Sequence, residues 1–318
     1  MENLPPLPQE NLILIDWLTF TVKTDEPAAV KEMIGMTSVS WQKCEKGLNG
    51  YPEREFFGNI NIMYGASPEM GVCCSMSGQG CRTFESHSAL SWELLLDRIT
   101  NNDHVRITRF DAAFDDHTGL LDIERIAQDT LDRLYVSRSW MSAVTKSDNQ
   151  RTDIRGTSVV IGSPSSSMLI RIYDKAAERG YDDDTHWIRI ELQMRDKIAM
   201  GFASGMIGAM DSFGTYFRGV LHNYLRFVEP AQDKNKSRWP TTDYWSKLLD
   251  GVSQIRCWSS PGVDYNMSRL ENFVLRQAGS AIKTYVKIWG WTRLSEELRR
   301  RNIELPQKYM KLIQEYGG

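Results

Sequence analysis

The chain has 318 residues, of which 41% are hydrophobic and 25% are charged. This composition excludes a disordered chain, which would lack the apolar residues for a core, and the length allows one large domain or two smaller ones. The formal net charge of -3 excludes a protein that is basic over its whole surface, so contact with nucleic acid would need local basic patches.

The first part of the chain is predicted to form a buried strand followed by an antiparallel meander. Residues 12–22 are rich in apolar and β-forming residues, and Asp16 is their only charge. A short helix is expected near 27–36. Further strands, separated by glycines, are expected around residues 39–45, 55–64 and 70–77.

Apolar residues at helical spacing then predict two amphipathic helices, at 91–99 and 121–135, that lie on a sheet. Strands are expected at 106–115, 167–175 and 187–195. From about residue 196 the pattern becomes helical. A break is expected at Arg238-Trp239-Pro240, then a helix over 243–252 and a long helix over 266–288. We therefore predict an α+β fold, a central antiparallel sheet with flanking helices in residues 1–200, followed by a mainly helical region at 201–318.

The N-terminal residues 1–11 lack the basic start and apolar run of a secretory signal, and no segment is apolar enough to span a membrane. We expect a cytoplasmic protein without membrane association. The cysteines lack the spacing of a zinc site or a disulfide framework and are interpreted as reduced, buried thiols; they are Cys44, Cys73, Cys74, Cys81 and Cys257.

Each of the three later strands carries a row of polar residues on one face. Residues two apart in a strand point to the same side of the sheet. The rows are Arg109, Asp111 and Asp115; Arg171, Tyr173 and Lys175; and Arg189, Glu191, Gln193 and Arg195. If the strands share an antiparallel sheet with one core-packed face, the rows line a common surface.

Such a surface suits phosphodiester chemistry. Carboxylates from Asp111, Asp115 and Glu191 could hold Mg²⁺ or Mn²⁺, which prefer oxygen ligands. Phosphate oxygens could be held by Arg171, Lys175, Arg109 and Arg189. A phenol that attacks phosphorus must lose its proton, and adjacent cations, Lys175 above all, are expected to lower the pKa of Tyr173. The alternative is a solvated sheet face with ordinary ion pairs, and periodicity alone does not decide between the two.

Several motifs resemble, in order, those of rolling-circle replication initiators from small plasmids and filamentous phages, and of related conjugative relaxases. The main one is Arg171-Ile172-Tyr173-Asp174-Lys175-Ala176-Ala177-Glu178. Others are Ile15-Asp16-Trp17-Leu18-Thr19-Phe20-Thr21, Ser77-Gly78-Gln79-Gly80-Cys81-Arg82, Arg109-Phe110-Asp111-Ala112-Ala113-Phe114-Asp115 and Trp187-Ile188-Arg189-Ile190-Glu191-Leu192-Gln193. The resemblance covers about residues 12–290.

The resemblance implies a palm-like nicking-initiator fold in which 1–200 is the catalytic domain and 201–318 contacts DNA or mediates dimerisation. It implies that Tyr173 attacks a phosphate of origin DNA, leaves a phosphotyrosine on the 5′ end and a free 3′ hydroxyl, and later rejoins the ends. Asp111 and Glu191 would hold the metal, with Asp115 a less certain third ligand and Asp16 another candidate. Many nicking enzymes use a His-hydrophobe-His pair instead, and this chain has none.

DNA contacts are expected at basic stretches and exposed aromatic rings. The basic stretches are Lys234–Arg238 and the arginines at 293 and 299–301. Unstacked bases could stack on Trp187, Trp239 or Trp245, although tryptophans are more often core residues. Partners implied are double-stranded and single-stranded origin DNA, a host helicase and polymerase, and a second copy of the chain.

Three alternatives remain at this stage. A relaxase of a conjugative element would use the same chemistry at a transfer origin. A DNA-binding regulator would keep the fold without cleavage. A metal phosphohydrolase would use the carboxylates and water, and Tyr173 would be dispensable.

Overall fold

The computed structural model describes residues 7–44, 46–147, 156–182, 184–250, 274–275, 278–301 and 313. The chain divides into two compact units, Met1–Trp258 and Ser259–Gly318. Helices beyond the expected boundary at residue 200 contribute to the core of the first unit through Phe202, Phe217 and Trp245.

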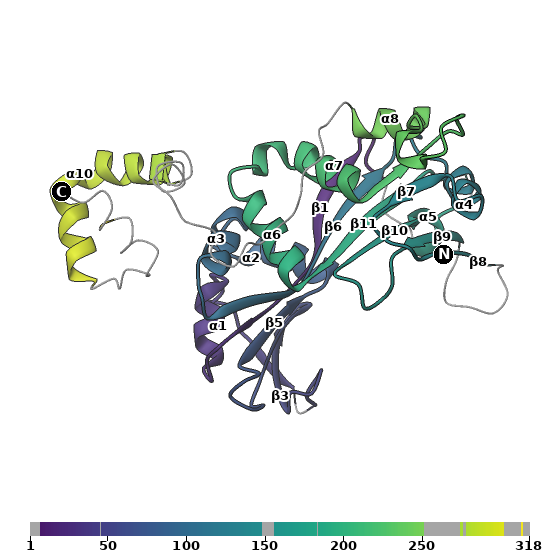
Figure 1. Ribbon diagram of the computed structural model, residues 1–318. Helices are drawn as coiled ribbons and strands as arrows, with labels where there is room; N and C mark the ends of the chain where they lie inside the picture. The colour runs from purple at the N-terminus through teal and green to yellow at the C-terminus, as the bar shows by residue number, and fades with distance from the viewer. Residues whose placement is uncertain are drawn as a thin grey trace. The chain divides into compact units, whose positions relative to one another are not determined.

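A ten-stranded sheet forms the centre of the first unit (Figure 1). Its strand order is β2-β3-β4-β5-β1-β6-β11-β10-β9-β8, and neighbouring strands are antiparallel throughout. In chain order these strands are β1 (Leu12–Val22), β2 (Gln42–Cys44), β3 (Glu53–Phe57), β4 (Ile60–Tyr64), β5 (Val72–Met76), β6 (Val105–Asp116), β8 (Ser142–Ser147), β9 (Gly156–Ile161), β10 (Met168–Asp174) and β11 (Ile188–Arg195). Strands β7 (Tyr135–Ser137) and β12 (Leu225–Phe227) form a separate pair.

Helices cover one face of this sheet. Those whose buried residues join the sheet's core cluster include α1 (Pro27–Met33), α2 (Gly78–His87), α3 (Trp92–Thr100), α4 (Ile123–Leu131), α6 (Asp196–Met206), α7 (Phe213–Tyr224) and α8 (Asp243–Leu249). The remaining helices are α5 (Lys175–Arg179), the short η1 (Met210–Ser212) and η2 (Lys236–Arg238), and α10 (Gly279–Arg300) in the second unit.

The alternation of side chains explains why only one face is covered. On β6, β10 and β11 the apolar residues Phe110, Ile172 and Leu192 point into the core cluster. The residues between them point the other way, so the polar rows are left on the face without helices.

The predicted fold class is confirmed, and the strand β1 has the predicted bounds. The strand expected across 55–64 is instead a hairpin of β3 and β4, because Gly58 adopts a φ of 54° that reverses the chain. Helix α2 and strands β8 and β9 were not predicted. Residues 266–273 and 276–277 of the helix expected over 266–288 lie outside the described residues, and α10 begins at Gly279.

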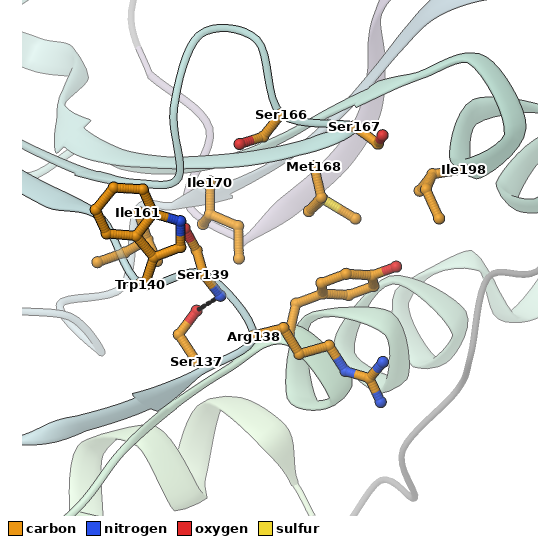
Figure 2. A pocket seen from close by; sticks show the side chains of 11 residues that line it. Ser137, Arg138, Ser139, Trp140, Ile161, Ser166, Ser167, Met168, Ile170 and Ile198 are labelled. Carbon is orange, nitrogen blue, oxygen red and sulfur yellow. Dashed lines mark hydrogen bonds between the residues drawn. The ribbon is translucent and has the colours of Figure 1, made fainter.

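A pocket of about 260 Å³ opens on the core-facing side of β10 (Figure 2). Ile161, Met168 and Ile170 line its apolar part, and Arg138 and Ser166 lie at its edge. None of the predicted site residues lines it. Where the structure describes helices, none is long and apolar enough to cross a membrane.

Candidate active site

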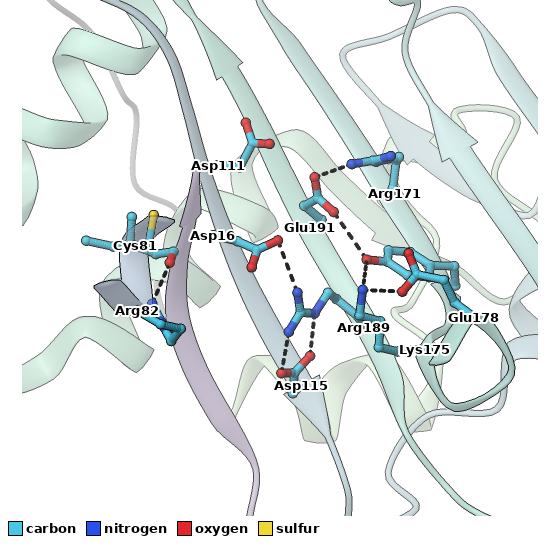
Figure 3. A network of polar contacts seen from close by, with 12 residues as sticks. Asp16, Cys81, Arg82, Asp111, Asp115, Arg171, Lys175, Glu178, Arg189 and Glu191 are labelled. Carbon is cyan, nitrogen blue, oxygen red and sulfur yellow. Dashed lines mark hydrogen bonds and ion pairs between the residues drawn. The ribbon is translucent and has the colours of Figure 1, made fainter. Parts of the chain in front are cut away.

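The register of three neighbouring strands brings the predicted polar rows together on the face of the sheet opposite the core cluster (Figure 3). Across β10 and β11, Arg171 lies opposite Glu191 and Tyr173 opposite Arg189. Across β11 and β6, the partners are Arg189 with Asp115, Gln193 with Asp111 and Arg195 with Arg109. Ion pairs and hydrogen bonds join many side chains of this surface in small groups.

The Tyr173 hydroxyl lies between a carboxylate and an ammonium group. It is 3.4 Å from Glu191 Oε2, to which it donates, and 3.4 Å from Lys175 Nζ, from which it accepts. Burial raises the pKa of Tyr173 above its ordinary value, and the negative charge of Glu191 adds to this effect. The expectation that neighbouring cations lower this pKa is therefore wrong for the protein alone, because they do not outweigh burial and the carboxylate.

The sequence predicts that Lys175 is the last residue of a strand, but in the structure it is the first residue of helix α5. Asp174 caps this helix through its side chain, which accepts from the Ala177 amide at 2.8 Å. The Lys175 side chain is buried and forms an ion pair with Glu178. Burial lowers the pKa of Lys175 although the Glu178 carboxylate opposes this shift. The helix start thus turns the amine toward the phenol oxygen.

Two carboxylates of the site, Asp111 and Glu191, are only 1% and 2% exposed. Each has one arginine partner: Arg109 Nε donates to Asp111 at 3.0 Å, and Arg171 pairs with Glu191. Burial raises the pKa of Asp111 to about 7, and its proximity to Glu191 contributes because two negative charges repel. Arg109 therefore does not fully compensate the buried charge of Asp111.

The third predicted metal ligand, Asp115, has a different environment. Arg189 donates to both of its carboxylate oxygens, at 2.6 and 2.7 Å, and also lies 3.1 Å from Asp16. Burial works against the charge of Arg189, but Asp115 and Asp16 hold its pKa above the ordinary value. No group of three or more acidic, histidine or cysteine residues suited to a metal occurs among the described residues. The predicted triad is thus divided into a pair, Asp111 and Glu191, and a separate ion pair.

Asp16 reaches the site through a β-bulge. The register of β1 with β6 shifts between Ile15 and Trp17, so Asp16 is the extra residue and has no partner on β6. The start of α2 lies beside it: a Cβ on Gly78 would be 2.8 Å from Asp16 Oδ1, and Arg82 donates to the Ile15 carbonyl at 2.7 Å. The motif Ser77–Arg82 therefore supports the bulge, a role that its glycines alone did not indicate.

The nearby histidine, tryptophan and cysteine side chains have other environments. His186 lies 2.9 Å from Asp116, a fully buried residue at the end of β6. Trp245 is 0% exposed, so the expectation that it stacks on a DNA base is wrong. Trp187 and Trp239 are partly buried. Among the cysteines, Cys73, Cys74 and Cys81 are buried free thiols, whereas Cys44 is partly exposed.

The antiparallel sheet carries acidic and cationic side chains around one tyrosine on a single surface, and the comparisons with known proteins identify the family. Residues 105–300 match the family described as "Replication initiation factor", and residues 12–96 match "Rolling Circle replication initiation protein N-terminal domain". The chain therefore belongs to the family of rolling-circle replication initiators and related DNA relaxases.

Two relatives illustrate this membership. The solved structure of a rolling-circle replication initiator protein from Geobacillus stearothermophilus has a TM-score of 0.68 and 30% identity, covering 79% of this chain and all of that one. The putative DNA relaxase NicK of Bacillus subtilis (strain 168) is 24% identical over 95% of this chain and 89% of its own length.

Proposed function

We propose that the protein nicks and rejoins one strand of origin DNA by metal-dependent transesterification, with Tyr173 as the nucleophile. The observation that carries the proposal is the placement of the Tyr173 hydroxyl, 3.4 Å from both Glu191 and Lys175 on the open face of the sheet. A half-buried tyrosine with a structural role would have its ring in the core. This one shares its face with charged residues.

The residues fit a hard divalent cation. Asp111 and Glu191 are both buried, and the raised pKa of Asp111, to which burial and Glu191 contribute, supports a place for a cation beside Asp111. Mg²⁺ in proteins is commonly held by one or two carboxylates together with substrate phosphate oxygens and water. We assign Asp111 and Glu191 as its ligands. When bound, Mg²⁺ or Mn²⁺ would neutralise phosphate charge and offset the carboxylate that raises the Tyr173 pKa. Both carboxylate oxygens of Asp115 accept hydrogen bonds from Arg189, so we assign Asp115 the role of holding that arginine in place.

The chain's own residues supply the remaining chemistry. Tyr173 Oη attacks phosphorus, a bond forms between them, and the bond from phosphorus to the 3′ oxygen breaks. Lys175 Nζ takes the phenol proton after it has lost one of its own protons to solvent, a loss that its lowered pKa favours, and Glu178 stabilises the ammonium that results. The 3′ oxygen leaves and takes a proton from solvent. In the rejoining step the 3′ hydroxyl loses its proton to solvent, its oxygen bonds to the phosphorus of the phosphotyrosine, the bond from phosphorus to Tyr173 Oη breaks, and Lys175 returns the proton to Tyr173.

Arg171 and Arg189 orient these groups. Arg171 pairs with Glu191 Oε1 and leaves Oε2 facing the Tyr173 hydroxyl. Arg189, fixed by Asp115 and Asp16, contributes a positive charge opposite Tyr173 on the neighbouring strand. Both arginines can therefore offset phosphate charge near the phenol without large movement.

The test is a nicking assay with supercoiled DNA of the replicon that carries the gene, with Mg²⁺ or Mn²⁺. The expected product is nicked circular DNA with protein attached to its 5′ end. Tyr173→Phe should abolish the adduct, and chelation with EDTA should do the same. Tyr181→Phe is the matched control, because Tyr181 lies nearby at the edge of the Trp187 ring, 6.0 Å between centroids. Normal nicking by Tyr173→Phe would overturn the assignment of the nucleophile.

A relaxase is the second candidate function, favoured by the similarity to NicK over 95% of this chain. It would use the same residues on a transfer origin. Plasmids that carry either the replication origin or the transfer origin of the element distinguish the two, because only the cognate origin should yield the adduct. A protein that shifts either DNA without any adduct would instead be a regulator. A host helicase, a polymerase and a second copy of the chain are the partners proposed for the initiator.

A further inference from the structure

Two arginines lie directly opposite each other where the last residue of β11 pairs with β6. Arg195 pairs in register with Arg109, and their neighbours Met194 and Phe110 point into the core. Both arginines therefore lie on the open face that carries Tyr173. Directly opposed residues have Cβ atoms about 4.5–5.5 Å apart, and like charges in such a pair destabilise a sheet. The pairing of Arg195 with Arg109 therefore lowers the stability of the sheet.

Only one of the two charges is compensated. Arg109 donates to Asp111 at 3.0 Å and its guanidinium lies over the Trp17 ring, 4.1 Å from the centroid. For Arg195, no carboxylate partner exists within the described residues, and its Nε is buried without a hydrogen-bond acceptor. The next residue, Asp196, pairs with Arg106 instead. A buried guanidinium N–H without an acceptor is a site that an anion would satisfy.

We propose that Arg195 and Arg109 bind a backbone phosphate of the strand that is cut, one that lies beside the scissile phosphate. This inference rests on the proposed function and assigns to the same face a second contact with its substrate. The row on β11 runs from Glu191 through Gln193 to Arg195, so at ~3.3 Å per residue Arg195 lies about 13 Å from Glu191. That separation is too long for a shared phosphate. It suits a neighbouring linkage of the same strand.

A bound phosphodiester would explain both unusual features of the pair. Its negative charge offsets the repulsion between the guanidinium groups, and its oxygens accept from Arg195 Nε. Trp17 and Asp111 fix the orientation of Arg109 from two sides. Because the arrangement destabilises the free protein, replacing Arg195 by glutamine should leave its stability unchanged or raise it while DNA binding weakens. An arginine with a purely structural role would show the opposite signs.

The first experiment compares wild type and Arg195→Gln in full-length form. The probe is a single-stranded oligonucleotide that spans the nick site, and its Kd is measured by fluorescence anisotropy at several KCl concentrations. We expect affinity to fall about fivefold at low salt and the slope of log K against log salt to decrease by about 0.7, the value for one lost phosphate contact on single strands. Arg98→Gln is the control, because Arg98 is exposed on α3 on the other face of the sheet.

The second experiment locates the phosphate. Oligonucleotides with one uncharged methylphosphonate linkage, placed at successive positions on each side of the nick, are bound to both proteins. One linkage near the nick should weaken binding to wild type and have no further effect on Arg195→Gln. Equal sensitivity of both proteins at every linkage, or an unchanged salt slope, would overturn the inference.

Thermal unfolding and adduct formation separate the remaining outcomes. A lower Tm for Arg195→Gln, together with unchanged affinity for DNA, would make Arg195 a structural residue. Failure of wild type to form a 5′ adduct would refute the proposed nicking function. Adduct formation by wild type with no binding defect in Arg195→Gln would refute only the phosphate site.

Discussion

Two aspartates of β6, Asp111 and Asp115, lie on the same face of the sheet. We expect their replacement by asparagine to have opposite effects on stability and on nicking. Both are almost fully buried, 1% and 2% exposed. Asp115 neutralises Arg189 through two short hydrogen bonds. Asp111 lies near a second buried carboxylate that repels it. Asn substitution removes a charge in each case and changes the size of the side chain very little.

For Asp115→Asn the expected cost is large. Removing one partner of a buried ion pair typically costs about 3–5 kcal/mol because the other charge is left without compensation. Asp16 still lies 3.1 Å from Arg189, so we expect the lower end of this range, about 3 kcal/mol. For Asp111→Asn the loss of the Arg109 pair is offset by relief of repulsion, and the side chain of Arg109 retains exposure and its contact with Trp17. The net change should be within about 1 kcal/mol.

For nicking activity the order should be the opposite, with the larger loss in Asp111→Asn and the smaller loss in Asp115→Asn. Loss of a residue that only supports metal ligands typically costs about 10–100-fold in affinity or activity, so loss of the ligand Asp111 should cost at least about 100-fold. Asp115→Asn, measured where it is folded, should keep the Mn²⁺ dependence of wild type. Urea unfolding without metal gives the first quantity, and adduct formation against Mn²⁺ concentration gives the second. If Asp115→Asn raises the Mn²⁺ requirement as much as Asp111→Asn does, Asp115 is a metal ligand and our division of the triad is wrong.

Three further changes test other contacts of the first unit. Lys175→Met removes the amine that lies 3.4 Å from Tyr173 and should slow single-turnover adduct formation about 100-fold with DNA affinity retained; an unchanged rate would exclude Lys175 as the proton acceptor. Gly78→Ala places a Cβ 2.8 Å from Asp16 and should cost about 1 kcal/mol in urea unfolding, whereas no cost would mean that the helix start adjusts freely. Burial opposes the charge of Glu55, but its hydrogen bonds to α1 and β4 outweigh this and lower its pKa, so its charge stabilises the fold above the ordinary pKa and the contribution is lost as the pH falls through the lowered value. Glu55→Gln should therefore lower Tm by about 2–4 °C at pH 7, and the difference from wild type should disappear near pH ~3; a difference that persists there would contradict the assignment.

The strands of the site could be predicted because their alternation is strict. In β6, β10 and β11 each apolar residue that enters the core is followed by one on the open face, so residue spacing alone placed Asp111, Tyr173 and Glu191 on a common surface. The partner of each charge could not be predicted in this way. Arg189 neutralises Asp115 only because the register sets them opposite each other, and register depends on the turns and on packing.

A local signal accounts for one of the differences. Asp174 followed by Lys-Ala-Ala-Glu is a helix start with an N-cap residue, which could have shown that Lys175 begins a helix. The bulge at Asp16 has no comparable signature. Before it, Ile15 is the core residue, and after it Leu18 and Phe20 are, so one alternation over the whole of β1 does not describe the strand. The opposite effects of burial and cations on the Tyr173 pKa likewise depend on distances that a sequence does not contain.

That bulge has a consequence for how related chains can vary in length. One added residue inside β6, β10 or β11 would move every later side chain of that strand to the other face of the sheet. Glu191 or Tyr173 would then point into the hydrophobic core. In β1 the added residue sits where the start of α2 supports it, and it contributes the carboxylate of Asp16 to Arg189. Tolerated insertions in relatives should therefore concentrate in the turns, and a deletion of Asp16 alone should remove the bulge, keep Ile15 and Leu18 in the interior, and leave Arg189 with Asp115 as its carboxylate partner.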